Sequence, residues 1–379
     1  MPDRVWAEIN LNNIEHNISQ IRRITGPGVK IMAVVKADAY GHGAEDFSRY
    51  LLSIGVDRLA VACVDEALQL KNAGIAAPIH ILSRTDESRV REVIENNFIQ
   101  TVSDSDMAFA LASKAKELKK RAVIHIKFDT GMGRLGFLCS KNSLDEVNKI
   151  IDEPVLETEG IATHFSSADE DDCEYTEMQY KLFSEMCEAV VKMGIKTPIR
   201  HASNSAAIFN HPHMCLDMVR PGAALYGIYT GASKFPDKNI QLPVLSLKAR
   251  VIGIKRMDAG SFIGYGKSYR VDSDSLIAVI SAGYADGYPR ALSNKGSVLI
   301  NGEAAPIIGN VCMDHCMADV TRLKNEIKIG QEAALITGDC DERFNIPGIV
   351  KTTGWISHEI ACGIGRRVPK IYTRPEKRD

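Results

Sequence analysis

The chain has 379 residues, of which 45% are hydrophobic and 25% are charged. These values are ordinary for a globular protein, and they exclude a disordered chain or a fibrous repeat. The 46 basic and 48 acidic residues leave a formal net charge of -2, so no general basic field attracts nucleic acid or an anionic membrane.

Short β-rich runs alternate with longer amphipathic stretches over the first 230 residues. The eight runs are Ile31–Val35, Leu59–Cys63, Pro78–Leu82, Ile99–Val102, Val123–Phe128, Gly160–His164, Pro198–Ala202 and Met218–Tyr226. Helical spacing marks the stretches Ala44–Leu52, Ser105–Lys119, Leu144–Ile151 and Thr176–Met193. Eight strand–helix units in this length predict a (β/α)8 TIM-type barrel with parallel strands. A doubly wound open sheet is the alternative, but no G-x-G-x-x-G follows the first strand.

The pattern changes near Gln241. The later runs are short, β-branched and separated by turn residues, and they cover Leu245–Lys255, Leu276–Gly283, Gly296–Gly302, Ala304–Gly309 and Glu332–Gly338. They predict a second, mainly antiparallel β domain. The expected division is a barrel over residues 1–240 and a β domain over 241–379, with a shared interface because no low-complexity linker separates them.

Targeting and metal signals are weak. The start of the chain has no apolar core of a secretory signal, and no apolar run approaches the roughly 18 residues that a membrane span needs. The nine cysteines are scattered, and only Cys312 and Cys316 lie close together. We therefore expect no metal site, and reduced thiols in a cytoplasmic protein.

Cationic and aromatic side chains follow several predicted strands, where a barrel of this type places its active site. They are Lys36 and Tyr40 after the first strand, Lys127 and Arg134 at the fifth, His164 at the sixth, His201, Asn204 and Ser205 at the seventh, and Arg220, Gly222 and Ala223 at the eighth. Each alone has a structural explanation, such as a hydrogen-bonded core histidine. Together the cations would repel one another, so an anionic cofactor or substrate is expected. Ser205 and the Gly222–Ala223 amides suit a phosphate.

Seven segments resemble motifs of the alanine racemase family, in the same order. They are AVVKADAYGHG (Ala33–Gly43), FDTGMGRLGF, THFSSADE, HASNSAA, MVRPGAALYG, SAGYADGYPR and NVCMDHCM. The resemblance extends from Trp6 to about Tyr372. It implies a barrel followed by a β domain, in agreement with the periodicity. It also implies pyridoxal 5'-phosphate as cofactor and the interconversion of L- and D-alanine, which supplies D-alanine for peptidoglycan.

The resemblance implies roles for the strand-end residues. Lys36 matches the lysine that binds pyridoxal phosphate covalently and then acts as a base. Tyr40, Ser205, Gly222 and Ala223 match the phosphate site, which Asn204 adjoins. Arg134 matches the arginine that contacts the cofactor and the substrate carboxylate, and Lys127 lies where many members carry a carbamylated lysine.

Arg220 matches the arginine that faces the pyridine nitrogen, with His164 and His201 as its orienting neighbours. A guanidinium does not readily release its proton. The ring nitrogen then stays largely unprotonated, which weakens the cofactor as an electron sink and favours return of the proton to the α-carbon. This favours a racemase over a transaminase.

The second domain supplies the other face of the site in this family. Tyr265 resembles the second base, while Tyr284, the Met313 amide and Asp314 resemble the group around the substrate carboxylate. These residues come from the partner subunit, so a homodimer with shared sites is implied. Lys36 would serve the D-enantiomer and Tyr265 the L-enantiomer. Without the motif, Tyr265 would be interpreted as a core aromatic residue.

Two positions depart from the family pattern. His358 stands where many members have a tyrosine near the phosphate and the substrate side chain, and Asn310 where some have an arginine. Both bear on substrate choice, so serine racemisation, alone or beside alanine, is the alternative. A related pyridoxal-phosphate decarboxylase would carry an acidic residue in place of Arg220. A non-catalytic cofactor carrier would be a single barrel.

Overall fold

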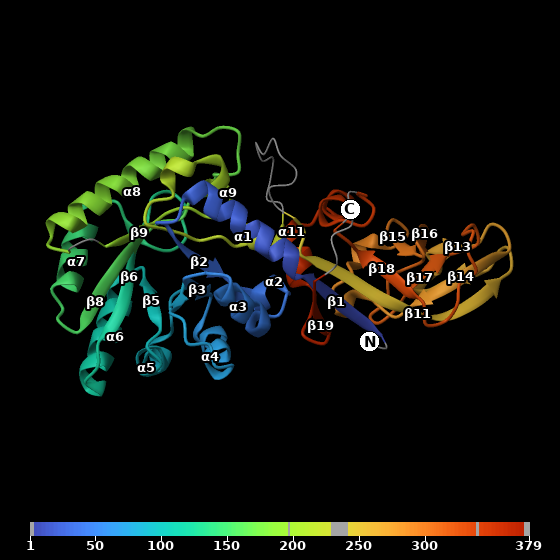
Figure 1. Cartoon of the computed structure of the whole chain (residues 1–379), viewed down its shortest axis with the longest axis horizontal. Coiled ribbons are helices and arrows are strands. Elements are labelled where there is room, and N and C mark those ends of the chain that lie inside the picture. The colour runs from blue at the N-terminus through green and yellow to red at the C-terminus, as the bar shows by residue number, and fades with distance from the viewer. Residues whose placement is uncertain (1–3, 196–197, 229–241, 339–340, 375–379) are drawn as a thin grey trace.

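The computed structural model describes residues 4–195, 198–228, 242–338 and 341–374. Figure 1 shows two bodies side by side, a barrel with its helices and a smaller body of strands. One continuous set of buried apolar side chains includes residues of both bodies, for example Ile31 in the first and Leu247 in the second. The expected shared interface is therefore confirmed.

The first body is a parallel barrel. Its strands, in the order in which they pair, are β10 (Met218–Val219), β2 (Lys30–Val34), β3 (Arg58–Val61), β4 (Ile79–Ile81), β5 (Ile99–Val102), β6 (Ala122–Asp129), β8 (Leu156–Ala162) and β9 (Ile199–His201). Backbone hydrogen bonds from Asp217 to Arg200 (3.2 Å) and from Arg220 to Ser203 (3.0 Å) link β9 to β10 and close the ring. All eight predicted strands are present, and the open-sheet alternative is excluded.

Helices connect successive strands of the barrel. They are α1 (Leu11–Thr25), α2 (Lys36–Tyr40), α3 (Ala44–Ser53), α4 (Val64–Asn72), α5 (Val90–Glu95), α6 (Ser105–Leu118), α7 (Lys141–Ile151), α8 (Glu174–Lys192) and α9 (Ser205–Asn210). Side chains of Asp104, Ser140 and Asn204 accept N–H groups at the starts of α6, α7 and α9, which explains where these helices begin. A short strand, β7 (Phe137–Leu138), pairs beside β6. The four predicted helical stretches are confirmed.

The eighth predicted strand is too long. The run Met218–Tyr226 was expected to be one strand, but β10 ends at Val219 and a 3-10 turn covers Ala223–Tyr226. Pro221 has no N–H group for the sheet. The next amides turn away, because the Gly222 and Ala224 N–H groups donate to Ser205 Oγ (2.9 and 3.1 Å). The strand therefore ends where the backbone amides begin to donate to Ser205 at the mouth of the barrel.

The second body contains one large sheet of eight strands. Their order is β14 (Ser275–Ile280), β17 (Cys316–Asp319), β16 (Glu303–Ile308), β15 (Ser297–Ile300), β18 (Glu332–Ile336), β11 (Leu245–Met257), β1 (Val5–Asn10) and β19 (Lys370–Thr373). The pairs are antiparallel except β1 with β19. The predicted antiparallel domain is thus confirmed, and β11 also pairs with β14.

The first strand of the chain was not predicted. β1 lies within residues 1–240, yet it pairs with β11 and β19 in the second sheet. The expected division at residues 240 and 241 falls within 229–241, outside the described residues.

Smaller elements complete the second body. A hairpin of β12 (Phe262–Ile263) and β13 (Tyr269–Arg270) carries the turn Tyr265–Lys267, and the helices α10 (Ile346–Thr353) and α11 (Ser357–Cys362) precede β19. None of the described helices combines the length and the apolar character needed to cross a bilayer.

Candidate active site

Lys36 begins a strained turn at the mouth of the barrel. The next four residues, Ala37, Asp38, Ala39 and Tyr40, all have φ between 51 and 54°, so α2 is left-handed beyond its first residue. For L-residues this conformation costs roughly 1–2 kcal/mol each. The turn therefore persists only because surrounding contacts stabilise it.

Those contacts come from both bodies. Glu66 accepts the Ala37 N–H (2.7 Å), and Asp38 accepts the first N–H of α3 (2.9 Å). From β19, the Tyr372 hydroxyl donates to the His42 carbonyl (2.8 Å). The position of Lys36 is thus determined by the barrel and by the end of the second sheet together.

The helix α11 packs directly on this turn. Gly41 has φ +79°, and a Cβ there would lie 2.2 Å from the Ala361 carbonyl oxygen, so only glycine permits the approach. The His358 ring consequently lies 5.6 Å from the Tyr40 ring, measured between centroids. Burial and the nearby charge of Lys36 lower the pKa of His358. The structure brings His358 to the Lys36–Tyr40 turn.

Arg220 is buried under the mouth, and both of its terminal nitrogens make polar contacts. Its guanidinium donates to three carbonyl oxygens, those of Thr163 (2.7 Å), His201 (2.7 Å) and Ala202 (2.8 Å). It also contacts Nδ1 of His201 (2.9 Å) and of His164 (3.2 Å). Burial lowers the pKa of Arg220 to about 10, which still leaves it charged at neutral pH. The predicted histidine neighbours are in place.

Burial keeps these histidines neutral. The pKa of His201 and of His164 is well below the usual range, first because both rings are desolvated and then because Arg220 is nearby. Neutral imidazoles can accept from the guanidinium, whereas imidazolium rings would repel it.

A small cradle lies between α9 and the turn after β10. Ser205 Oγ accepts the amides of Gly222 and Ala224, so the hydroxyl proton remains available for another acceptor. The Tyr40 hydroxyl faces the same place, because a Cβ on Gly222 would lie 2.9 Å from it. The Gly222 amide, expected to bind phosphate, is instead engaged by Ser205 in this structure.

Adjoining residues complete the cradle. Asn204 begins α9 by accepting the Ala207 N–H (3.0 Å), and its amide nitrogen donates to the Phe165 carbonyl (3.2 Å). Ala223 is buried at the start of the 3-10 turn. Asn204 thus positions Ser205, and its side chain is used within the protein.

Lys127 and Arg134 lie at the end of β6. Lys127 is only 8% exposed, and its ammonium group has no hydrogen-bond or ion-pair partner among the described residues. Burial lowers its pKa to about 8, with further lowering by Arg134 and Arg220. The main-chain N–H of Arg134 donates to Asp129 (2.7 Å), which also accepts the Gly131 amide (2.9 Å) and thereby shapes the loop.

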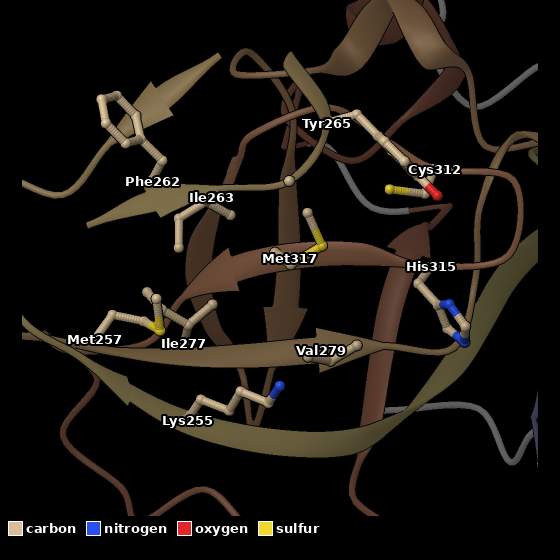
Figure 2. Close-up of a pocket in the computed structure, with 11 residues that line it drawn as sticks. Lys255, Met257, Phe262, Ile263, Tyr265, Ile277, Val279, Cys312, His315 and Met317 are labelled. Carbon is tan, nitrogen blue, oxygen red and sulfur yellow. The ribbon is translucent and has the colours of Figure 1, made fainter. Parts of the chain in front are cut away.

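The tyrosine-bearing face of the β domain is exposed. Tyr265 is 77% exposed, Met313 53% and Tyr284 43%. Figure 2 shows Tyr265 and Cys312 above the strand that carries Met317, at the edge of a cavity of about 500 Å³ with mainly apolar walls. In Figure 1 the adjacent strand β13 lies far from α2. The single chain does not bring Tyr265 to Lys36.

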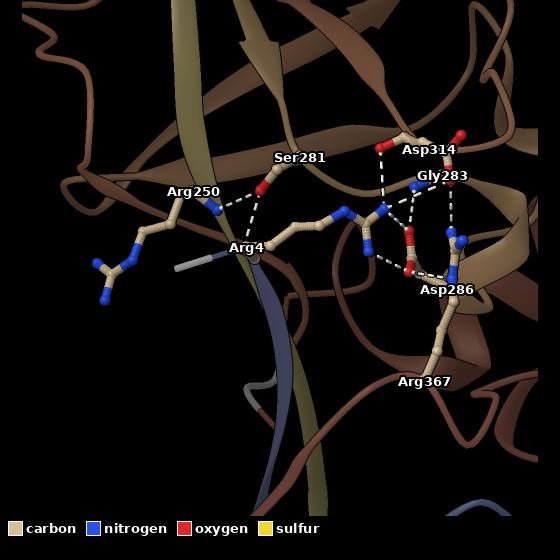
Figure 3. A network of polar contacts seen from close by, with 7 residues as sticks. All are labelled: Arg4, Arg250, Ser281, Gly283, Asp286, Asp314 and Arg367. Carbon is tan, nitrogen blue, oxygen red and sulfur yellow. Dashed lines mark hydrogen bonds and ion pairs between the residues drawn. The ribbon is translucent and has the colours of Figure 1, made fainter. Parts of the chain in front are cut away.

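An ion-pair network supports the loops of this face (Figure 3). The buried Asp286 carboxylate accepts both terminal nitrogens of Arg4 (2.7 Å each), Arg367 Nε (2.9 Å) and the Gly283 amide (3.0 Å). Arg367 also pairs with Asp314 (2.8 Å). The Asp314 carboxylate therefore stabilises its own loop here, and a direct contact with substrate remains a prediction.

The loops of Tyr284 and Met313 are joined by their backbones. The Tyr284 N–H donates to the Cys312 carbonyl (3.0 Å), and the Ala285 N–H donates to the Met313 carbonyl (3.0 Å). Asn310 donates from its side chain to the Tyr265 carbonyl (2.8 Å). Tyr265, Tyr284 and Met313, three of the predicted contributors of the β domain, thus share one connected surface.

Two groups of functional interest were missed from the sequence. Glu66, which holds the Lys36 turn, lies in the first turn of α4, shortly after the end of β3, and was not singled out. His125 lies inside β6, two residues before Lys127, and contacts His201 (2.7 Å). The sequence held a signal for His125, because residues two apart on a strand face the same side. His125 and Lys127 therefore both face the barrel interior.

Comparisons with known proteins agree with this site. The alanine racemase N-terminal domain family matches residues 9–230, and the alanine racemase C-terminal domain family matches 244–372. An alanine racemase of Desulforamulus reducens is 41% identical over 372 residues, which are 98% of this chain and 100% of the relative.

Solved structures give the same result. The alanine racemase of Clostridium difficile has a TM-score of 0.93 at 36% identity, covering 99% of this chain and 96% of that one. The alanine racemase of Bartonella henselae, solved with covalently bound pyridoxal phosphate, has a TM-score of 0.86 at 30% identity, covering 98% and 100%. The chain therefore belongs to the alanine racemase family.

Proposed function

We propose that this chain is a pyridoxal-phosphate-dependent racemase that interconverts L- and D-alanine and supplies D-alanine for peptidoglycan. The observation that carries the proposal is the convergence at the barrel mouth. A lysine on a strained turn, a charged buried arginine and a small hydroxyl-lined cradle all meet there.

The mouth fits the phosphate end of the cofactor. The space beside Gly222 is one that a single Cβ would fill, and the hydroxyls of Ser205 and Tyr40 border it. The positive charges of Arg220, Arg134 and Lys36 suit an anionic group. When bound, pyridoxal phosphate supplies an electron sink for the charge that develops on the substrate α-carbon.

Arg220 sets the type of reaction. Its five N–H groups can only donate, and it stays charged at neutral pH, so it does not hand a proton to the group it faces. A related decarboxylase would have an acidic residue here. Arginine therefore favours removal and return of one proton at the same carbon, which is racemisation.

Two bases on opposite sides are required for that exchange, because one base does not reach both faces of a held substrate. We assign the first to the Lys36 amine and the second to the phenol of Tyr265 of the partner subunit. Support for a homodimer comes from the exposed Tyr265, Tyr284 and Met313 beside an apolar cavity. Such an exposed apolar surface is typical of an interface.

The substrate carboxylate would meet Arg134 and, from the partner subunit, the Met313 amide with Tyr284 and Asp314. Carbamylation of Lys127 belongs to the same proposal. A pKa of about 8 leaves part of the amine neutral at physiological pH, and only the neutral amine adds carbon dioxide. The carbamate would replace a cation beside Arg134 by an anion that can hold it.

A turnover assay tests the proposed reaction. The purified protein with added pyridoxal phosphate should abolish the optical rotation of L-alanine and also of D-alanine, ending at equal amounts of both. His358 beside Tyr40 favours serine as a second substrate, because an imidazole can hydrogen-bond an added hydroxyl. Loss of rotation with release of carbon dioxide, and without formation of the opposite enantiomer, would identify a decarboxylase instead.

Mixed subunits test the shared sites. Lys36→Ala and Tyr265→Phe proteins should each be nearly inactive. After unfolding and refolding together, half of the dimers are mixed and each holds one complete site, so activity should return to about a quarter of the wild type. No recovery, with mixed dimers demonstrated by tagged subunits, would contradict sharing. A cytoplasmic location is also part of the proposal, supported by the scattered cysteines, eight of which are free in the described residues.

A further inference from the structure

A chain of polar contacts leads from Arg220 down through the barrel interior. Arg220 contacts Nδ1 of His201 (2.9 Å), and Nε2 of His201 contacts Nδ1 of His125 (2.7 Å). Nε2 of His125 then contacts Glu159 Oε2 (2.9 Å). Both imidazoles are fully buried, so no water competes for their nitrogens.

The groups at the two ends of this series of contacts determine which atom donates each hydrogen bond along it. A guanidinium only donates and a carboxylate only accepts. Burial holds the pKa of His125 and His201 below the usual range, so each ring carries one N–H. His125 must therefore donate from Nε2 to Glu159, and accept at Nδ1 from His201 Nε2–H. His201 then presents a bare Nδ1 to Arg220.

With the opposite pair of tautomers, two acceptors would face each other at the Glu159 end and two donors would face each other at the Arg220 end. His125 would turn a lone pair toward the Glu159 carboxylate. His201 would turn an N–H toward the N–H of Arg220. Only one pair of tautomers satisfies the whole chain.

Two features of the β8 backbone make this series of contacts possible. Ile124 pairs with Thr158 and His125 pairs with Gly160, so Glu159 is an extra residue in β8, at a β-bulge. A Cβ on Gly160 would lie 2.4 Å from the His125 ring. The bulge brings the carboxylate to the ring, and the glycine makes room for that ring.

Arg58 neutralises the carboxylate. It donates from two nitrogens to Glu159 (2.6 and 2.7 Å) and from one to His80 Nε2 (3.2 Å). His80, His125 and Glu159 could otherwise be taken for a metal site, because their ligand atoms lie within 4.8 Å of one another. The guanidinium already occupies the acceptors that a metal ion would need, and its charge would repel the ion.

We propose that Glu159 is a positioning residue for the reaction, because its carboxylate keeps His125 and His201 as Nε2–H tautomers and so maintains His201 as an acceptor for Arg220. The proposal rests on the proposed function for the importance of Arg220. It extends the working part of the barrel from the mouth to the first residue of β3 and the middle of β8.

A matched pair of double variants tests it without leaving Arg58 unpaired. Arg58→Met with Glu159→Leu removes the ion pair and the acceptor. Arg58→Met with Glu159→Gln removes the ion pair but keeps a carbonyl oxygen that can accept from His125. Nitrogen-15 spectra of labelled histidine rings in the holoenzyme report which ring nitrogen carries hydrogen, and thermal unfolding confirms that both variants fold.

We expect wild type and the glutamine variant to show Nε2–H rings at 125 and 201, and the leucine variant to show loss of this single state. Affinity for pyridoxal phosphate, followed by its absorbance, should fall about three- to tenfold in the leucine variant alone. Identical spectra and affinities in the two variants would overturn the proposal, as would Nδ1–H rings in the wild type. The ring measurement needs no turnover, so failure of the proposed reaction would be seen separately.

Discussion

The barrel mouth and the tyrosine-bearing face of the β domain differ in how far one chain completes them. At the mouth, Arg220 contacts five atoms of four residues in its own chain, and Ser205 and the Lys36 turn are held by internal hydrogen bonds. On the other face, Tyr265 is 77% exposed. One half of the proposed site is finished by folding alone, while the other is presented outward. The cationic groups of the mouth are thus preorganised by folding, whereas the proposed second base would depend on dimer assembly.

Among the substitutions that test this comparison, replacing Lys36 at the mouth should cause the largest loss of turnover. Lys36→Ala would remove both the proposed covalent attachment and one proposed base, so we expect a loss of turnover of at least about a thousandfold. Polarimetry measures the loss, and borohydride treatment followed by mass analysis detects covalent cofactor. A cofactor still attached through a reducible bond in this variant would rule out the assignment.

Replacing Tyr265 should separate the contribution of the β-domain face from that of the barrel mouth. Tyr265→Phe should slow proton removal from L-alanine by about 10²–10⁴-fold, while cofactor affinity stays as in the wild type, because the mouth is complete without it. Exchange of the α-hydrogen in deuterated water, measured separately for each enantiomer, tests this. Tyr269→Phe, in the same hairpin, is the matched control. Wild-type exchange from both enantiomers would remove Tyr265 as a base.

Burial of the Lys127 amine at the mouth should make the free energy of unfolding depend on pH. The pKa of Lys127 is lowered from 10.5 to about 8. Between these pH values the unfolded chain keeps a proton that the folded protein has released, so folding becomes more favourable as pH rises. In buffer free of carbon dioxide, the free energy of unfolding should rise by roughly 3 kcal/mol more in wild type than in Lys127→Met. Parallel pH curves would show that the amine is not buried in solution.

Filling the cradle should weaken the cofactor. A Cβ at position 222 would lie 2.9 Å from the Tyr40 hydroxyl, which must then move. For Gly222→Ala we expect about tenfold weaker binding of pyridoxal phosphate, from overpacking of the order of 1–2 kcal/mol. Gly28→Ala is a suitable control because nothing lies within 4 Å of the added carbon. Equal affinities in the two variants would place the phosphate elsewhere.

An effect of similar size, on substrate preference rather than on cofactor affinity, should arise at His358, where the β domain reaches the mouth. Introducing the family tyrosine, His358→Tyr, should shift the ratio of kcat/KM toward alanine over serine by on the order of tenfold, about 1.4 kcal/mol. Racemisation of both amino acids is followed in wild type and variant. An unchanged ratio would mean that specificity is set by other residues.

Much of the barrel was predictable from the sequence, because strands and helices have different apolar periods and strand ends meet at one mouth. The strand ends therefore led to Lys36, His164, His201 and Arg220. The left-handed turn was not predictable, since Ala37–Tyr40 carry no glycine and their conformation is imposed by distant contacts. Glu159 was overlooked because its bulge exists only in the pairing of β6 with β8.

The placement of β1 also has a consequence for synthesis on the ribosome. β1 is translated before the barrel strands, but its neighbours β11 and β19 are translated after them. The barrel strands, which lie between them in sequence, can pair while β1 still has no sheet to join. A nascent chain thus carries an unpaired hydrophobic strand for most of its translation, when it is most prone to bind other chains. Synthesis of β19 completes the second sheet and, through Tyr372, fixes the lysine turn. Binding of the proposed cofactor at Lys36 would therefore have to await synthesis of β19.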